Sequence, residues 1–354
     1  MQTLWFIIVA LMLTTYVVLD GFDIGAGVIS LLAAKTDGER RVILRAIGPV
    51  WDGNEVWLLA AGGTLYFAFP QLYASSFSGF YLPLMMVLWL LMLRAIGIEF
   101  RAHVDSSVWK NFFDATFFLA STLLAIFFGA ALGNVIRGVP LGADGYFFEP
   151  LWTNWQLGPN TGILDWYTVI CGVVALIALT SHGALYIAVK TEAPINQRAR
   201  AVSVMLWPVL FFLTIVSLVA TMFVRPAMLI NYRTHPIGLL IPLLVFAALS
   251  AMIWAVPKGK ERLAFTASAL YIGGMLVGAA FGLYPVVLPS RDGVHDLTIY
   301  NTAAGHHGLV VGLAWWILGM ALAIAYFLFV YRMFKGKVKV EELSQTQIAG
   351  AGRA

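Results

Sequence analysis

The segment that decides the fold class is residues 201–224, which read AVSVMLWPVLFFLTIVSLVATMFV and contain no Asp, Glu, Lys or Arg. A helix needs about 20 apolar residues to cross the roughly 30 Å hydrocarbon layer of a bilayer, whereas barrel strands alternate polar and apolar side chains over about 10 residues. This unbroken run therefore predicts a membrane-spanning helix.

Eight further runs of similar length and apolar character occur along the chain, at residues 4–32, 49–69, 77–98, 115–133, 166–189, 237–256, 263–288 and 308–331. The first run has no basic residue before it and is longer than the core of a signal peptide, so we expect it to be a retained helix. The sequence therefore predicts an all-α polytopic membrane protein with nine transmembrane helices.

The composition agrees with this fold class. Hydrophobic residues make up 60% of the chain and charged residues only 11%, against about 25% charged residues in an average soluble domain. Too few polar groups are present to cover a water-facing surface, which excludes a soluble enzyme, and the apolar content excludes a disordered chain. Cys171 is the single cysteine, so no disulfide can form within the chain.

Basic residues are distributed unevenly between the two ends of the predicted helices. Of the 22 Lys and Arg, 18 follow spans one, three, five, seven and nine, and the last of these groups includes Lys339 and Arg353. The opposite ends hold only Arg137, Arg225, Arg233 and Arg291. By the positive-inside rule the N-terminus faces outside and the C-terminus is cytoplasmic. The net charge of +4 thus reflects topology and implies no nucleic-acid partner.

The predicted spans suggest a division of the chain into four parts. Residues 1–133 form a first four-helix bundle, 134–161 an outer-surface connection rich in Gly, Pro and Trp, and 162–288 a second four-helix bundle. Residues 289–354 contain a ninth, peripheral helix and a cytoplasmic tail. Tryptophan favours the headgroup layer, which is why we expect the connection to lie along the outer membrane surface.

Four carboxyl groups lie within the first two predicted spans. Asp20 and Asp23 are three residues apart near the inner end of the first span, and Asp52 and Glu55 repeat this spacing at the start of the second. Residues three apart share one face of a helix. Because the second span returns from the side where the first one ends, we expect the four groups to converge near the cytoplasmic face.

A carboxyl group inside a membrane span costs about 2.5–3.5 kcal/mol or more, so such groups normally face protein or water and have a role. Burial and neighbouring like charges both favour the protonated carboxyl, which is what a proton relay requires. Arg94, near the end of the third span, is a candidate charge partner. The alternative is that Arg94, Arg45 or Lys35 neutralises the acids and the cluster only locks helices together.

No sequence motif indicates that this chain holds a metal or a cofactor by itself. His182 is the one histidine deep within a predicted span, and His306 and His307 lie at the opposite membrane side, so they cannot face it across one haem. We expect His182 to make core hydrogen bonds. Trp57, one half-turn beyond Glu55, is a candidate for lining an oxygen or cofactor route.

Several motifs resemble one known family, at residues 20–25 (DGFDIG), 51–58 (WDGNEVWL), 78–81 (SGFY), 94–97 (RAIG), 284–285 (YP) and 290–303. The chain is similar over nearly its whole length to subunit II of the cytochrome bd quinol oxidases. The resemblance implies a heterodimeric terminal oxidase of the bacterial cytoplasmic (inner) membrane, which oxidises quinol, reduces oxygen to water and takes protons from the cytoplasm.

The resemblance also implies the cofactors and partners. Two haems b and one haem d are expected in the complex, mainly on the larger subunit I. Subunit II is expected to support the haem-bearing side and to provide proton and oxygen access, and to contact membrane lipid. A small accessory subunit and a bound structural quinone or lipid are further candidates.

Carried over by motif, Asp52 matches the family's proton-pathway aspartate, Asp20 and Asp23 match its acidic pair, and Trp57 closes the second motif. Glu55 is a less certain member, because some relatives carry a neutral amide there. Two other functions stay open: a proton-coupled transporter or channel subunit that uses the same acids, and a purely structural partner. Six of the nine predicted spans carry no charge, which argues against a solute path.

Overall fold

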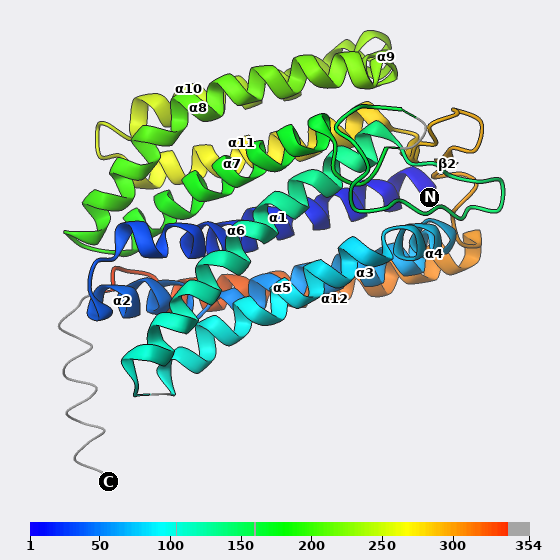
Figure 1. Cartoon of the computed structure of the whole chain (residues 1–354). Helices are drawn as coiled ribbons and strands as arrows, with labels where there is room; N and C mark the ends of the chain where they lie inside the picture. Colours follow the sequence, from blue (N-terminus) through cyan, green and yellow to red (C-terminus); the bar gives the residue numbers. More distant parts are fainter. Residues whose placement is uncertain (104, 159–160, 339–354) are drawn as a thin grey trace.

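The computed structural model describes residues 1–103, 105–158 and 161–338, and it confirms the expected helical fold. Long helices lie side by side along one common direction (Figure 1). The helices are α1 (Gln2–Ala33), α2 (Asp37–Ile47), α3 (Trp51–Ala68), α4 (Pro70–Gly79), α5 (Tyr81–Glu99), α6 (Ser107–Arg137), α7 (Trp166–Lys190), α8 (Ile195–Val224), α9 (Leu229–Thr234), α10 (Leu240–Ala255), α11 (Glu261–Leu283) and α12 (His306–Met333). Short 3-10 turns, Phe100–Ala102, Pro226–Met228 and Pro236–Leu239, extend or join some of them.

Eight helices in the described part of the chain are long and apolar enough to cross a membrane. They are Gln2–Ala33, Tyr81–Ala102, Ser107–Arg137, Trp166–Lys190, Ile195–Val224, Pro236–Ala255, Glu261–Leu283 and His306–Met333. The segment expected as the second span forms α3, which is 18 residues long, contains two acids and is not among the eight. Pro70 begins α4 directly after α3, because proline at a helix start loses no intrahelical hydrogen bond.

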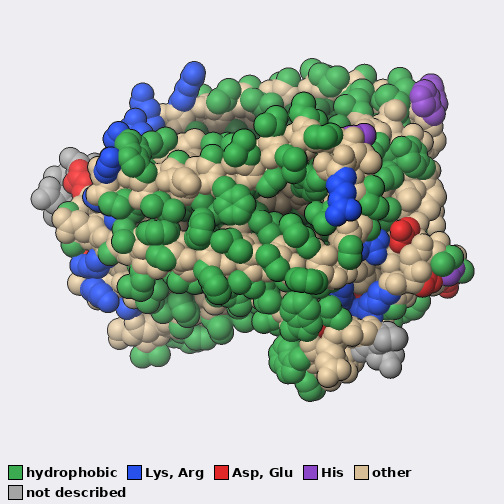
Figure 2. Space-filling model, turned by 90° about the horizontal axis from the view of Figure 1, so that it is seen from above, with side chains coloured by type: hydrophobic (Ala, Val, Ile, Leu, Met, Phe, Trp, Pro, Cys, Tyr) green, Lys and Arg blue, Asp and Glu red, His purple; other side chains and the backbone are tan. Residues whose placement is uncertain are grey.

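The two ends of the molecule differ in what they carry. The N-terminus lies at one end with α4, α9 and a small antiparallel hairpin of β1 (Val286–Leu288) and β2 (Leu297–Thr298), whereas α2 lies at the other end (Figure 1). We call these the hairpin end and the α2 end. Figure 2 shows a hydrophobic belt with Lys and Arg side chains toward the two ends. Lys339 and Arg353 of the predicted cytoplasmic set lie outside the described residues.

Helix α7 lies at the centre and packs against α1, α6, α8 and α11. Its contact with α1 is very close: a Cβ atom on Gly25 would lie 1.9 Å from the Leu179 carbonyl oxygen and 2.8 Å from the Gly183 nitrogen. One core cluster combines Ile24 of α1 with Leu179 of α7 and other residues of α6, α8, α10 and α11. The two predicted four-helix bundles therefore share a continuous core.

Helix α2 was not predicted from the sequence. Thr36 caps it by accepting a hydrogen bond from the Glu39 backbone nitrogen, and the Glu39 carboxylate accepts in return from the Thr36 nitrogen. This reciprocal capping box stabilises a helix start. One face of α2 is buried through Val42, Ile43 and Ile47, so α2 covers the hydrophobic core at this end of the molecule.

Candidate functional site

The predicted acids of the first span are buried in the interior of the molecule. Asp20 and Asp23 lie on α1, and both have an exposed fraction of 0%. The uninterrupted apolar sequence on either side keeps α1 helical through this point, so the three-residue spacing places both side chains on one face. That face meets α3 and α5, from which the remaining polar groups of the site come.

Arg94 of α5 joins two of the acids. Its Nη1 donates to Asp20 Oδ1 at 2.7 Å and its Nη2 donates to Glu55 Oε2 at 2.8 Å, and its own side chain is fully buried. Glu55 lies on α3 and is partly exposed. Arg94 thus occupies the position of the candidate charge partner, and it ties α1, α3 and α5 together.

Asp23 is held by a different set of groups. Asn54 Nδ2 donates to Asp23 Oδ2 at 2.7 Å, and the Tyr331 hydroxyl of α12 donates to Asn54 Oδ1 at 2.9 Å. No cation pairs with Asp23 among the described residues. In the sequence Asn54 is part of a recognisable motif, but the motif gave it no role. Tyr331 was missed, because a tyrosine at the end of an apolar run is typical of the headgroup layer.

Several buried polar atoms around these groups have no hydrogen-bond partner in the described part of the chain: Tyr16 Oη, Asp20 Oδ2, Asp23 Oδ1, Trp57 Nε1 and Arg94 Nε. Buried polar groups are nearly always satisfied, and bound water is the usual partner when protein groups do not reach them. Asp20 Oδ2 and Asp23 Oδ1 are therefore oxygens that a bound water would satisfy.

Asp52 does not join the buried network. It lies in the first turn of α3, is exposed, and makes no hydrogen bond or ion pair with any described side chain. Trp57 is partly buried, and its ring lies 5.6 Å from the ring of Phe327 on α12. The expected convergence of four acids is thus observed for Asp20, Asp23 and Glu55, while Asp52 lies on the surface one turn before Glu55.

His182 is buried and both of its ring nitrogens have partners. Nε2 lies 3.0 Å from the Val18 carbonyl oxygen, Nδ1 lies 2.6 Å from Ser268 Oγ, and the ring stacks on Phe265. The search of the described residues gives no group of three or more His, Cys, Asp or Glu that could hold a metal ion. These contacts fit the expected core role of His182.

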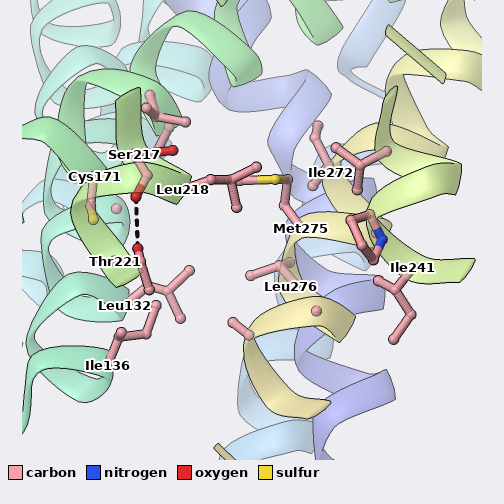
Figure 3. Close-up of a pocket in the computed structure, with 18 of the residues that line it drawn as sticks. Leu132, Ile136, Cys171, Ser217, Leu218, Thr221, Ile241, Ile272, Met275 and Leu276 are labelled. Atoms are coloured by element: carbon pink, nitrogen blue, oxygen red, sulfur yellow. Dashed lines mark hydrogen bonds between the residues drawn. The ribbon is translucent and has the colours of Figure 1, made fainter. Parts of the chain in front are cut away.

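A second feature is an apolar cavity of about 390 Å³ between α6, α7, α8, α10 and α11. Figure 3 shows apolar side chains such as Leu132, Ile136 and Leu276 around it, with Ser217 and Thr221 at one side. The Thr221 hydroxyl donates to the Ser217 carbonyl oxygen at 2.7 Å, so it is already satisfied within α8. The cavity suits an apolar chain, and Trp57 does not line it.

A buried ion-pair network at the hairpin end was missed by the sequence analysis. Arg137, at the end of α6, pairs with Glu149 at 2.9 Å and with Asp165, and Arg291 also pairs with Glu149. Burial raises the pKa of the Glu149 carboxyl. The only sequence signal was that Arg137 and Arg291 belong to the small set of basic residues predicted on the outer side.

Comparison with known proteins identifies relatives along the whole chain. Residues 1–334 match the family model described as cytochrome bd terminal oxidase subunit II. The cytochrome bd ubiquinol oxidase subunit 2 of Bacillus subtilis is 30% identical, and the match covers 97% of this chain and 98% of that protein. The cytochrome bd-I ubiquinol oxidase subunit 2 of Escherichia coli is 28% identical, with 98% and 97% covered.

A solved structure has the same fold. A chain of the bd oxidase from Geobacillus thermodenitrificans superposes with a TM-score of 0.74 at 18% identity, and the match covers 94% of this chain and 98% of that one. At this identity the likeness concerns the fold.

Proposed function

Because the chain belongs to the cytochrome bd terminal oxidase subunit II family, we propose that it conducts protons from the cytoplasm toward subunit I and supports the haem-bearing side of that partner. As subunit II it is a multi-pass protein of the bacterial inner membrane and the partner of subunit I. In the proposed reaction the complex oxidises quinol, reduces oxygen to water and draws the protons for water through this chain. The proposal includes a topology of nine transmembrane helices. In this topology α3 is the second span, in addition to the eight spans given above, and the α2 end lies in the cytoplasm.

The side chains of this chain do not fit a haem. His182 is the buried histidine, and its two ring nitrogens already face Val18 and Ser268. Of the other histidines, His103, His235, His306 and His307 are exposed, and His295 is partly exposed and pairs with Asp292. We therefore assign the two haems b and the haem d of the complex mainly to subunit I.

The observation that carries the proposal is the charge balance of the buried network. The network contains three carboxyl groups, Asp20, Asp23 and Glu55, and one buried cation, Arg94, which pairs with Asp20 and Glu55 but not with Asp23. A second unpaired anionic charge in such a place costs several kcal/mol. The network is therefore most stable when it holds a proton, and Asp23, which has only the neutral Asn54 as partner, is the natural place for it.

The surface position of Asp52 indicates where the route begins. Asp52 is exposed on the same helix as Val56 and Leu59, whose exposed fractions are 50% and 73%. An ionised carboxylate does not face lipid, so this face of α3 meets water or subunit I. We propose that protons pass from Asp52 to Glu55 and on to the Asp20 and Asp23 pair. Trp57 and Phe327 then form an apolar wall beside the route, which is a candidate oxygen path.

One observation favours a structural role for part of the network. Arg94 satisfies Asp20 and Glu55 by direct ion pairs that join three helices. Removing one partner of a buried pair typically costs 3–5 kcal/mol. Asp20 and Arg94 would then lock α1, α3 and α5 together, while Asp23 keeps the proton-carrying role.

The experiment uses the complete complex, purified through subunit I. Asp23→Asn keeps the size of the side chain and removes the carboxyl group that can take up and release a proton. We expect haem content and the reduced-minus-oxidised spectrum to stay unchanged and quinol-driven oxygen consumption to fall roughly tenfold or more, in line with the usual contribution of a positioned acid or base. Asp144→Asn, an exposed acid at the hairpin end, is the matched control and keeps full activity.

Three results would contradict the proposal. Full oxygen consumption by an Asp23→Asn complex with normal haem content removes Asp23 from the route. Activity without any haem-bearing partner would instead support the transporter reading. Loss of assembly in Asp20→Asn together with an active Asp23→Asn complex supports the purely structural role.

A further inference from the structure

A groove on α8 lies at the α2 end of the molecule, far from the acids. It is a hollow of about 520 Å³ lined by Gln197, Arg200, Ala201, Val204 and Met205. The turn between α10 and α11, residues 256–260, borders it and carries Lys258 and Lys260. We call this place the basic groove, defined by the five lining residues together with the two lysines.

Arg200 connects the groove with the turn. Its Nη2 donates to the Val256 carbonyl oxygen at 3.3 Å. A Cβ atom on Gly259 would lie 3.6 Å from Arg200 Nη1, so the guanidinium lies directly beneath the turn. Gly259 has a φ of 68°, a left-handed conformation that favours glycine. The turn thus places Arg200 beside Gly259, which lies between Lys258 and Lys260 in the sequence.

The two lysines gather around one indole ring. Lys258 Nζ lies 4.1 Å and Lys260 Nζ 4.2 Å from the centroid of the Trp254 ring. The two ammonium groups thus share one ring as a neighbour. No carboxylate of the described residues pairs with either lysine or with Arg200. Three cations therefore belong to one turn and the helix beneath it without a paired carboxylate, which is an arrangement that an anion would stabilise.

The surroundings of these cations are apolar and face the membrane. Val204 and Met205 on α8 are exposed by 41% and 73%. Trp254 is half-exposed, as tryptophan is at the boundary between headgroups and hydrocarbon. A water-facing basic surface would not adjoin exposed side chains of this kind. The groove therefore offers positive charge at headgroup depth and an apolar channel directly next to it.

We propose that the basic groove binds the headgroup of an anionic phospholipid, with the phosphate between Arg200, Lys258 and Lys260 and one acyl chain along Ala201, Val204 and Met205. Basic pockets between transmembrane helices on the cytoplasmic side are a recurrent way of holding such headgroups. In Figure 1, α8 and α10 form the layer farthest from α3 and α12. The site is thus separate from the proposed proton route and goes beyond the proposed function.

The test compares lipid retention by two variants of the complete complex. Lys258→Gln/Lys260→Gln removes two cations from the groove. Arg45→Gln/Lys335→Gln removes two exposed cations at the same end, one on α2 and one just after α12, and serves as the charge-matched control. Each complex is incorporated into nanodiscs of phosphatidylglycerol with phosphatidylcholine, extracted gently, and weighed by native mass spectrometry to count the bound lipids.

We expect the native complex and the control to retain phosphatidylglycerol in preference to phosphatidylcholine, and the groove variant to bind it roughly fivefold more weakly per cation removed. A second readout needs no variant: rising NaCl should release phosphatidylglycerol from the native complex and leave phosphatidylcholine unchanged. Equal losses in both variants, or retention that is insensitive to salt, would overturn the site. If inorganic phosphate alone, without phosphatidylglycerol, stabilised the native complex, the lipid assignment would be overturned in favour of a free anion.

Discussion

Asp20 and Asp23 lie one turn apart on α1 and meet different partners. Asp20 faces the guanidinium of Arg94, whereas Asp23 faces the amide of Asn54, which in turn accepts a hydrogen bond from Tyr331. The carboxyl group of Asp20 is therefore compensated by a cation, whereas that of Asp23 is compensated only by the dipole of an amide. This difference is consistent with the proposed proton-carrying role of Asp23, although the sequence spacing treats the two carboxyl groups alike.

Part of this arrangement could be predicted from single residues. Charges in apolar runs are conspicuous, so the acids and Arg94 were found from the sequence. Asn54 and Tyr331 were not assigned roles, because neutral polar groups are common in membrane helices and the two lie 277 positions apart in the chain. Only the packing of α12 against α3 brings them together.

A residue-scale prediction concerns Glu39 on α2 and Arg198 on α8. The Arg198 guanidinium donates to both carboxylate oxygens of Glu39, at 2.8 and 2.9 Å, and lowers the pKa of that carboxyl from about 4.5 to about 2. A lowered pKa in the folded state stabilises the fold above the ordinary value and loses this effect as the pH falls through the lowered one.

Arg198→Gln should therefore lower the stability of the complex at pH 7. The difference in apparent melting temperature between the native complex and the variant should be constant above about pH 5 and shrink as the pH falls toward 2. Thermal denaturation across this range measures it, with Lys110→Gln, which breaks the exposed pair with Asp105, as the control. A difference that stays constant down to pH 2 would contradict this linkage.

At the scale of helices, the close approach of α1 and α7 determines how the two halves of the chain meet. Gly25 and Gly183 remove the side chains that would keep the two backbones apart. Without strong hydrophobic attraction between helices in lipid, such small-residue contacts are a principal source of association. The sequence alone does not show that Gly25 and Gly183 meet, because their contact depends on the fold.

Gly25→Ala tests this contact. The added methyl group would collide with the Leu179 carbonyl oxygen, so α1 and α7 must separate, and overpacking of this kind typically costs about 1–3 kcal/mol. We expect a lower yield of assembled complex and a lower melting temperature. Gly38→Ala on α2 has no atom within 4 Å of the new methyl group and should leave both unchanged. Equal behaviour of the two variants would show that the α1–α7 contact is not tight.

Helices could be predicted from the sequence wherever a long apolar run is compatible only with a membrane-spanning helix. The eight candidate spans overlap eight of the expected runs. The expected second span is the exception, because its acids and glycines lower its apolar content and Pro70 starts a new helix after Phe69. Helix α2 was missed since it is short and charged, although Thr36 and Glu39 already carry the capping-box spacing.

At the scale of the whole molecule, its two sides are proposed to serve different neighbours. The side with α3 and α12 carries Asp52 and the Tyr331 contact, and is proposed to meet subunit I. The opposite side with α8 and α10 carries the basic groove and is proposed to meet lipid. The core around α7 connects α1 and α6 with α8, α10 and α11, so the side with the basic groove shares its core with the helix that carries Asp20 and Asp23.

The central claim is that protons for oxygen reduction pass through this chain, starting at Asp52. The most direct measurement is time-resolved proton uptake from the α2 side during a single turnover of the quinol-reduced complex in liposomes, for the native complex, Asp52→Asn and the Asp144→Asn control. With normal haem content, Asp52→Asn should slow proton uptake roughly tenfold or more while the control keeps the native rate. Proton uptake at the native rate in an Asp52→Asn complex with normal haem content would contradict the account.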